Sequence, residues 1–122
     1  MRKVIVLTAL LLTAVSCGDD ETEPTPNPTD ATITITATGV NPTSVTINAG
    51  GRINWVNADT VPHHPSSDPH PSHTDCPGLG VSSPLNPTQS GQSGAMNTRR
   101  TCGFHDHLND TNASLRGSVI IQ

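Results

Sequence analysis

Apolar and polar residues alternate with a period of two in several short segments of this chain. From Ala31 to Ala37 the odd-numbered positions are alanine or isoleucine, and the even-numbered positions are threonine. Val45 and Ile47 continue the alternation in a second run, and residues 52–57 form a third. Successive side chains of a strand point to opposite faces, so this pattern predicts strands with one buried and one exposed face.

The same pattern returns at the end of the chain, where the odd-numbered positions of residues 115–121 form one mostly apolar face. A weaker run over residues 95–104 predicts the strand before it. Residues 59–92 are mainly Pro, Ser, Gly and His and have almost no strand pattern, which indicates a long loop with a function or with mobility. Short strands separated by turn residues therefore predict one β-sandwich over residues 31–122.

The composition limits the size of the core and the class of partner. Of 122 residues, 32% are hydrophobic and 2% aromatic, and there are 11 prolines and 10 glycines. This leaves room for a single domain with a small core and excludes a helical bundle. The formal net charge is −4 and no run of basic residues occurs, which excludes a nucleic-acid-binding surface.

Residues 1–16 have the features of a secretion signal, because a basic start precedes an apolar stretch too short for a permanent membrane span. The ending Ala-Val-Ser-Cys at residues 14–17 resembles the lipobox of bacterial lipoproteins. This resemblance implies that the signal is removed and that Cys17 is acylated. An ordinary cleaved signal with an incidental cysteine is the alternative.

Residues 17–30 are rich in acids and proline and contain no large apolar side chain, so they predict an extended linker rather than part of the core. With acyl chains on Cys17, the domain is expected to be tethered to a bacterial membrane without a transmembrane helix. The expected location is the periplasmic side or the cell surface.

All histidines of the chain lie in two places, and the sequence pattern puts neither in a strand. Four are in the long loop and two directly follow the predicted strand at residues 95–104: His63, His64, His70, His73, His105 and His107. Imidazole is the commonest metal ligand among side chains. Such a concentration of histidine predicts a metal site.

Three segments resemble motifs of the cupredoxins, the family of plastocyanin and azurin. Residues 57–63, Asn-Ala-Asp-Thr-Val-Pro-His, are similar to the family's N-x-D-x-x-P-H. Residues 102–105, Cys-Gly-Phe-His, resemble its C-x-x-H, and residues 115–121 resemble its closing strand, M-x-G-x-V-x-V. The resemblance covers residues 31–122 and implies an all-β, cupredoxin-like Greek-key β-sandwich with a long His- and Pro-rich loop.

The resemblance also implies a function. It predicts one copper ion that cycles between Cu(II) and Cu(I), bound by His63, Cys102 and His105, with His107 as a further candidate ligand. Leu115 stands where the family has its axial methionine and offers no donor atom. The implied activity is single-electron transfer to a redox partner protein.

The cysteines leave a second alternative open. With Cys17 lipidated, Cys76 and Cys102 remain, and two cysteines of an exported protein often form a disulfide. That disulfide would remove Cys102 from the copper site. The ligands would then all be imidazoles: His63, His105, His107 and, as a fourth, His73.

An all-histidine site suits both Cu(II) and Zn(II). It predicts a copper-handling protein, for delivery or sequestration, whose partner is a copper donor or acceptor. In this alternative Asp106 is expected to accept a hydrogen bond from a ring N–H. His64 and His70 are interpreted as surface residues.

No phosphate-binding loop, Ser-His-Asp arrangement or pair of catalytic carboxylates is found in the sequence, so an enzyme is not expected. A metal-free sandwich that acts as an interaction module is a third alternative.

Overall fold

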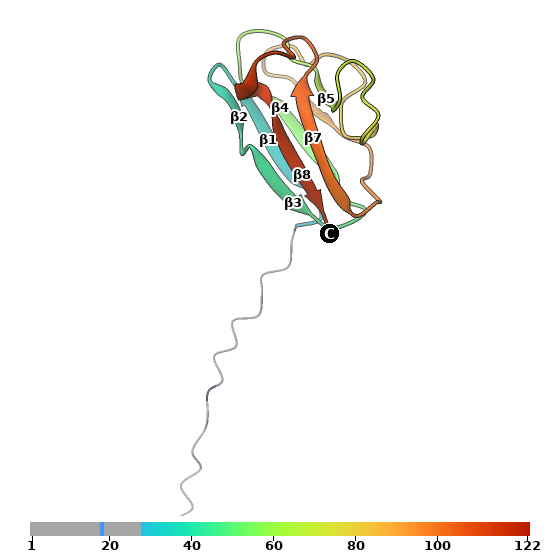
Figure 1. Ribbon diagram of the computed structural model, residues 1–122. Helices are drawn as coiled ribbons and strands as arrows, with labels where there is room; N and C mark the ends of the chain where they lie inside the picture. Colours follow the sequence, from blue (N-terminus) through green and yellow to red (C-terminus); the bar gives the residue numbers. More distant parts are fainter. Residues whose placement is uncertain (1–17, 19–27) are drawn as a thin grey trace, which may run out of the picture.

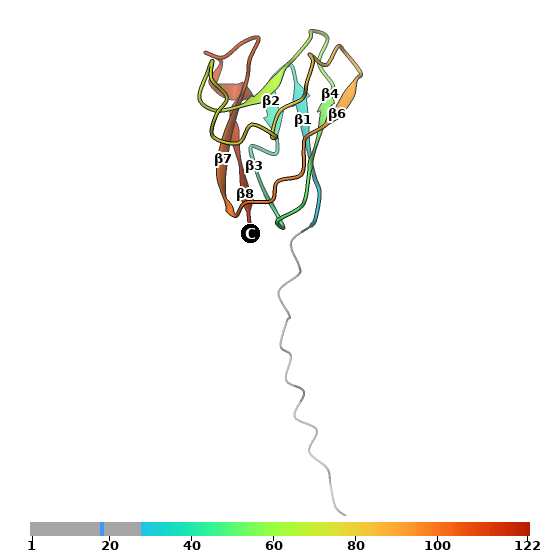
Figure 2. The same ribbon diagram turned by 90° about the vertical axis from the view of Figure 1, so that its right-hand side faces the viewer.

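The computed structural model describes Gly18 and residues 28–122. The predicted signal, the lipidation site Cys17 and most of the linker lie outside the described residues. Within them the chain forms two four-stranded sheets, ordered β2-β1-β4-β6 and β3-β8-β7-β5, packed as a sandwich (Figure 1). Figure 2 shows the two layers from the side. The predicted all-β sandwich is confirmed.

The first sheet contains β1 (Ala31–Thr36), β2 (Gly39–Asn41), β4 (Ile53–Asn57) and β6 (Ser90–Gln92). The second contains β3 (Ser44–Ile47), β5 (Pro65–Ser67), β7 (Arg100–Asp106) and β8 (Gly117–Ile121). The β1–β4 and β3–β8 pairs are parallel, and the other pairs are antiparallel. A short 3-10 helix, η1 (Ala113–Leu115), precedes β8. No helix in the described residues is long and apolar enough to cross a membrane.

The strands differ from the sequence prediction mainly around the long loop. β5 and β6 lie within residues 59–92, where no strand was predicted, and β7 begins and ends later than the predicted 95–104. β5 has the sequence Pro-Ser-Ser, which carries no apolar pattern, and it is a strand because it pairs with the end of β7. Ser66 lies opposite His105 in this pairing. His105 is therefore in a strand, contrary to the prediction.

The core is centred on two aromatic rings. Trp55 of β4 and Phe104 of β7 pack edge to face, with ring centroids 4.9 Å apart, and so join the two sheets. The indole Nε1 of Trp55 donates a hydrogen bond of 3.0 Å to the carbonyl of Leu79, which is itself fully buried. This bond attaches the long loop to the core.

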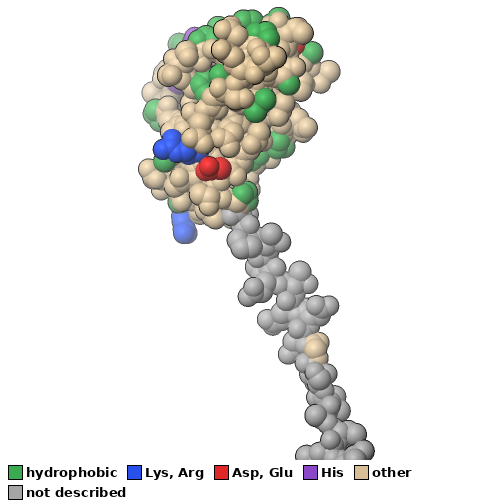
Figure 3. Space-filling model, turned by 180° about the vertical axis from the view of Figure 1, so that it is seen from behind, with side chains coloured by type: hydrophobic (Ala, Val, Ile, Leu, Met, Phe, Trp, Pro, Cys, Tyr) green, Lys and Arg blue, Asp and Glu red, His purple; other side chains and the backbone are tan. Residues whose placement is uncertain are grey.

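The chain enters and leaves the sandwich at the same end. Backbone hydrogen bonds there join Asn48 to Pro28 and Ala49 to Gln122. β7 starts at this end and runs to the other, and its seven residues span about 20 Å at a rise of ~3.3 Å from each residue to the next. From behind, the domain exposes few charged side chains (Figure 3).

A disulfide joins Cys76 to Cys102, with the two Cα atoms 6.0 Å apart. Both cysteines are buried. They are 26 positions apart in the sequence, and their bond closes the chain between them into a loop. The loop residues 68–75, which follow β5, are thereby fixed at their far end to β7. Their near end is held by the hydrogen bond from the Asp68 N–H to the carbonyl of Gly103.

Replacement of both Cys76 and Cys102 by Ser is expected to lower the free energy of unfolding by about 3 kcal/mol, because a cross-link across a loop of this length restricts the unfolded chain. Urea unfolding of the variant and the parent measures the difference. A loss below about 1 kcal/mol, or reaction of either cysteine with a maleimide in the unreduced folded protein, would contradict the cross-link.

Candidate metal centre

Strand β7 presents alternate side chains to opposite sides of its sheet. Cys102 and Phe104 face the core and are buried there. Gly103 and His105 face the other way, toward Asp68 of the loop after β5. Cys102 and His105 therefore point away from each other, and they cannot be ligands of the same ion.

The sulfur of Cys102 is also bonded to Cys76. A thiolate binds copper, whereas a sulfur in a disulfide is not a thiolate. The structure thus contains the cysteine pairing of the second alternative. The ligand set His63, Cys102 and His105, implied by the resemblance, is not brought together.

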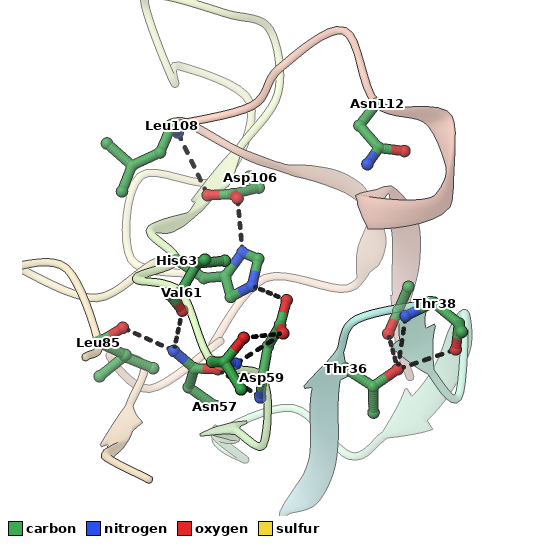
Figure 4. Close-up of polar contacts among 12 residues, drawn as sticks. Thr36, Thr38, Asn57, Asp59, Val61, His63, Leu85, Asp106, Leu108 and Asn112 are labelled. Atoms are coloured by element: carbon green, nitrogen blue, oxygen red, sulfur yellow. Dashed lines mark hydrogen bonds and ion pairs between the residues drawn. The ribbon is translucent and has the colours of Figure 1, made fainter. Parts of the chain in front are cut away.

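His63 is held between two carboxylates (Figure 4). Its Nδ1 lies 2.7 Å from Oδ2 of Asp106, and its Nε2 lies 3.0 Å from Oδ2 of Asp59. Asp106 also accepts hydrogen bonds from the backbone N–H groups of His64 and Leu108. Both ring nitrogens of His63 therefore already have partners, and this buried network ties together the loops at the end of the sandwich.

Four other histidines form a cluster on the outer side of β7: His70, His73, His105 and His107. One ring nitrogen from each lies within 4.8 Å of the corresponding atoms of the other three. Two come from the loop after β5, one from β7 and one from the residues directly after β7. In the described part of the chain, this is the group of side chains arranged to hold a metal ion.

His105 is the buried member of the cluster. Its Nδ1 lies 2.7 Å from Oδ1 of Asp68, and a carboxylate accepts only when the ring nitrogen carries the proton. In the tautomer with this proton on Nδ1, the lone pair is on Nε2, which is buried and has no hydrogen-bond partner. A carboxylate behind a histidine and a free nitrogen in front of it are the arrangement found at metal-bound histidines.

Space for this contact depends on Gly103. A Cβ built on Gly103 would clash with the carboxylate of Asp68. The glycine in the Cys-Gly-Phe-His segment therefore lets Asp68 reach His105 on the same face of β7.

The other three histidines are held by different contacts. Nδ1 of His107 lies 3.1 Å from Nε2 of His73. His73 has a positive φ of 52°, a rare conformation for a residue with a side chain, and its N–H donates to the carbonyl of Pro69. His70 is exposed, and its Nε2 lies 3.9 Å from a carboxylate oxygen of Asp110.

Two side chains in this region have shifted pKa values. Burial is the main cause that lowers the pKa of His73. Repulsion from neighbouring imidazoles lowers it further, and His105 contributes most to this repulsion. His73 thus stays neutral, the form that binds metal, at lower pH than an isolated histidine. Outside the cluster, the hydrogen bond from His63 is the main cause that lowers the pKa of Asp59, followed by the N–H of Thr60.

The sequence identified part of this cluster. His105 and His107 were predicted ligands, His73 was the fourth member of the all-histidine alternative, and His70 was interpreted as a surface residue. His70 and His73 are separated by two residues in one loop, as metal-binding cysteine pairs are, and this short gap could have drawn attention to His70. Nothing in the sequence pointed to Asp68.

No protein-family model matches the chain, and no curated protein matches it in sequence. Solved structures do match it. A purple cupredoxin from Nitrosopumilus maritimus is 21% identical, with a TM-score of 0.59 over 76% of this chain and 100% of its own. An oxidized mutant of amicyanin is 15% identical, with a TM-score of 0.61 over 75% of this chain and 81% of its own.

The oxidized plastocyanin of Dryopteris crassirhizoma is also similar, with 15% identity and a TM-score of 0.59 over 75% of this chain and 99% of its own. These proteins align with the described sandwich over most of their own length. The described domain therefore has the cupredoxin fold.

Proposed function

We propose that this chain is an exported copper-handling protein that binds one copper ion through His70, His73, His105 and His107. The proposal keeps the all-histidine alternative from the sequence and changes its ligand set, because His63 is occupied by two carboxylates and His70 lies in the cluster. The partner is a copper donor or acceptor.

One observation carries the proposal more than any other. Nε2 of His105 is buried without a hydrogen-bond partner, while the other nitrogen of the ring is bonded to Asp68. An unpaired polar atom in the interior costs about 1–3 kcal/mol, so such an atom calls for a ligand. The nearest suitable groups are the nitrogens of the other histidines, which could share a metal ion with it.

Copper is favoured over other metals by the donor set. Four neutral imidazoles are borderline ligands that suit Cu(II), and divalent copper binds nitrogen sites more tightly than the other first-row divalent ions. One of the similar solved structures is named as a cupredoxin, and two amicyanin mutants among them are named in their Cu(I) forms.

The disulfide at Cys102 favours copper delivery or sequestration over electron transfer. A thiolate-copper site requires a free thiol on the same side as its histidines. Cys102 is in a disulfide and faces the core, whereas His105 faces the loop. No catalytic step is assigned to the site.

Attachment to a membrane through Cys17 is part of the proposal. The described domain begins at the end that holds Pro28 and Gln122, and β7 carries His105 to the opposite end (Figure 1). A tether at the first end would therefore leave the histidine cluster pointing away from the lipid.

Titration of the full chain with Cu(II) tests the site. A Cys17→Ser background prevents that cysteine from adding a thiolate signal. Binding is expected to saturate at one equivalent, with weak visible absorption and a paramagnetic resonance spectrum of nitrogen ligands, because no thiolate is present. His105→Ala is expected to abolish tight binding, whereas His64→Ala, which removes a histidine outside the cluster, is expected to preserve it.

An intense visible band would instead indicate thiolate-to-copper charge transfer and an electron-transfer site. If the chain binds no copper, the domain is better interpreted as an interaction module.

Asp68→Ala is expected to weaken Cu(II) binding by about 10–100-fold, because the carboxylate fixes the ring of His105 and raises its basicity. Asp75→Ala, which removes an exposed carboxylate from the same loop, serves as the matched control and should bind as the parent does. Competition with a chelator measures the affinity, and circular dichroism checks that both variants are folded. Equal affinities for the two variants would exclude the positioning role of Asp68.

Lipidation is tested in cells that export the chain. Labelled fatty acid is expected to appear in the mature protein and to disappear in Cys17→Ala, because the acyl chains are attached to that cysteine. Mass spectrometry of the N-terminal peptide gives the same answer directly. If the mature protein carries no lipid and is cut at another position, residues 1–16 are an ordinary cleaved signal and the lipidation proposal is wrong.

A further inference from the structure

We infer that His70 is the ligand through which the cluster exchanges its metal with a partner, while His105 is the ligand that retains it. This inference rests on the proposed metal site and adds the route by which copper leaves and enters. The acceptor is a molecule that presents an imidazole or another nitrogen donor to the exposed side of the cluster.

The four histidines differ in their access to solvent. The side chain of His105 has no exposed surface, and that of His70 is 31% exposed. His73 and His107 are intermediate. The residues on either side of His70, from Pro69 to Ser72, are all exposed as well. An incoming donor can therefore reach the metal beside His70 without displacing other parts of the protein.

The histidines also differ in how firmly the protein holds them. His105 lies in a paired strand, and its ring is bonded to Asp68 at 2.7 Å. His70 has an oxygen of Asp110 at 3.9 Å, beyond hydrogen-bond distance, and that side chain is itself 40% exposed. Within the described residues, the ring of His70 makes no hydrogen bond and otherwise contacts only the rings of the other cluster members, with centroids 4.9 to 5.9 Å apart. Its rotation away from the cluster therefore breaks no hydrogen bond.

His73 is on the same loop but is restrained by its backbone. Its N–H donates to the carbonyl of Pro69 at 2.7 Å, and its Nε2 lies 3.1 Å from Nδ1 of His107. The loop end beyond it is attached to β7 by the disulfide at Cys76. Within one loop, His73 is thus held by hydrogen bonds, whereas His70 is held only by ring contacts and by the distant carboxylate of Asp110.

The exchange is a ligand substitution. The bond between the ion and the nitrogen of His70 breaks, and a bond between the ion and a donor nitrogen of the acceptor forms. The imidazole leaves as a neutral ring, and no electron is transferred. The three remaining histidines hold the ion until the acceptor supplies further donors.

Stopped-flow transfer of Cu(II) from the loaded full chain to EDTA tests this assignment, with free imidazole as a second probe. The transfer rate of the parent is expected to rise in proportion to EDTA. His70→Ala is expected to bind one copper and to transfer it roughly tenfold faster, since its position is open to the chelator. Free imidazole should restore the parental spectrum and slow transfer in this variant.

His105→Ala and His64→Ala are the comparisons. Imidazole should fail to restore the parental spectrum of His105→Ala, because the missing ring of that variant leaves a buried gap. His64→Ala should transfer Cu(II) to EDTA at the parental rate. A parental transfer rate in His70→Ala, or a parental rate independent of EDTA, would overturn the exchange role. The exchange role would also be overturned if imidazole restored the parental spectrum equally well in His70→Ala and His105→Ala. Failure of the unaltered chain to bind one copper would refute the proposed metal site itself.

Discussion

The pairing of β5 with β7 decides which side chains of the segment from Cys102 to Asp106 face the core and which face the loop. Pro65 lies opposite Asp106 and Ser66 opposite His105, so β7 continues as a strand to the end of this segment. A strand alternates its side chains. Cysteine and histidine three residues apart therefore lie on opposite sides of the sheet, and the C-x-x-H spacing cannot form one site here.

Each side of β7 then satisfies its polar groups in its own way. On the inner side, Asp106 accepts hydrogen bonds from His63, His64 and Leu108, so a buried carboxylate is fully paired. On the outer side, Asp68 accepts from His105 but leaves the second ring nitrogen without a partner. The inner network is complete in the described structure, whereas the outer one leaves Nε2 of His105 without a hydrogen-bond partner. This difference is the physical basis for proposing the metal on the outer side.

The loop after β5 links stability to the site. It is fixed to β7 by the Asp68–Gly103 backbone bond and by the disulfide, and it carries His70 and His73 between these attachments. The loop has little apolar surface to bury, since most of its residues are exposed. Cross-linking and backbone hydrogen bonds therefore replace hydrophobic packing in holding two histidines near β7. A protein with a small core can in this way position a site on a surface loop.

The sequence by itself determined the sandwich, because the alternation at residues 31–37, 52–57 and 115–121 depends only on which side chains prefer the core. It also predicted a metal site among the histidines, and it left the fate of Cys102 open. Only the tertiary structure decided the rest. The strand character of Pro65–Ser67 comes from its partner β7 and not from its own residues. The contact of Asp68 with His105 joins residues 37 positions apart, and no local pattern encodes it.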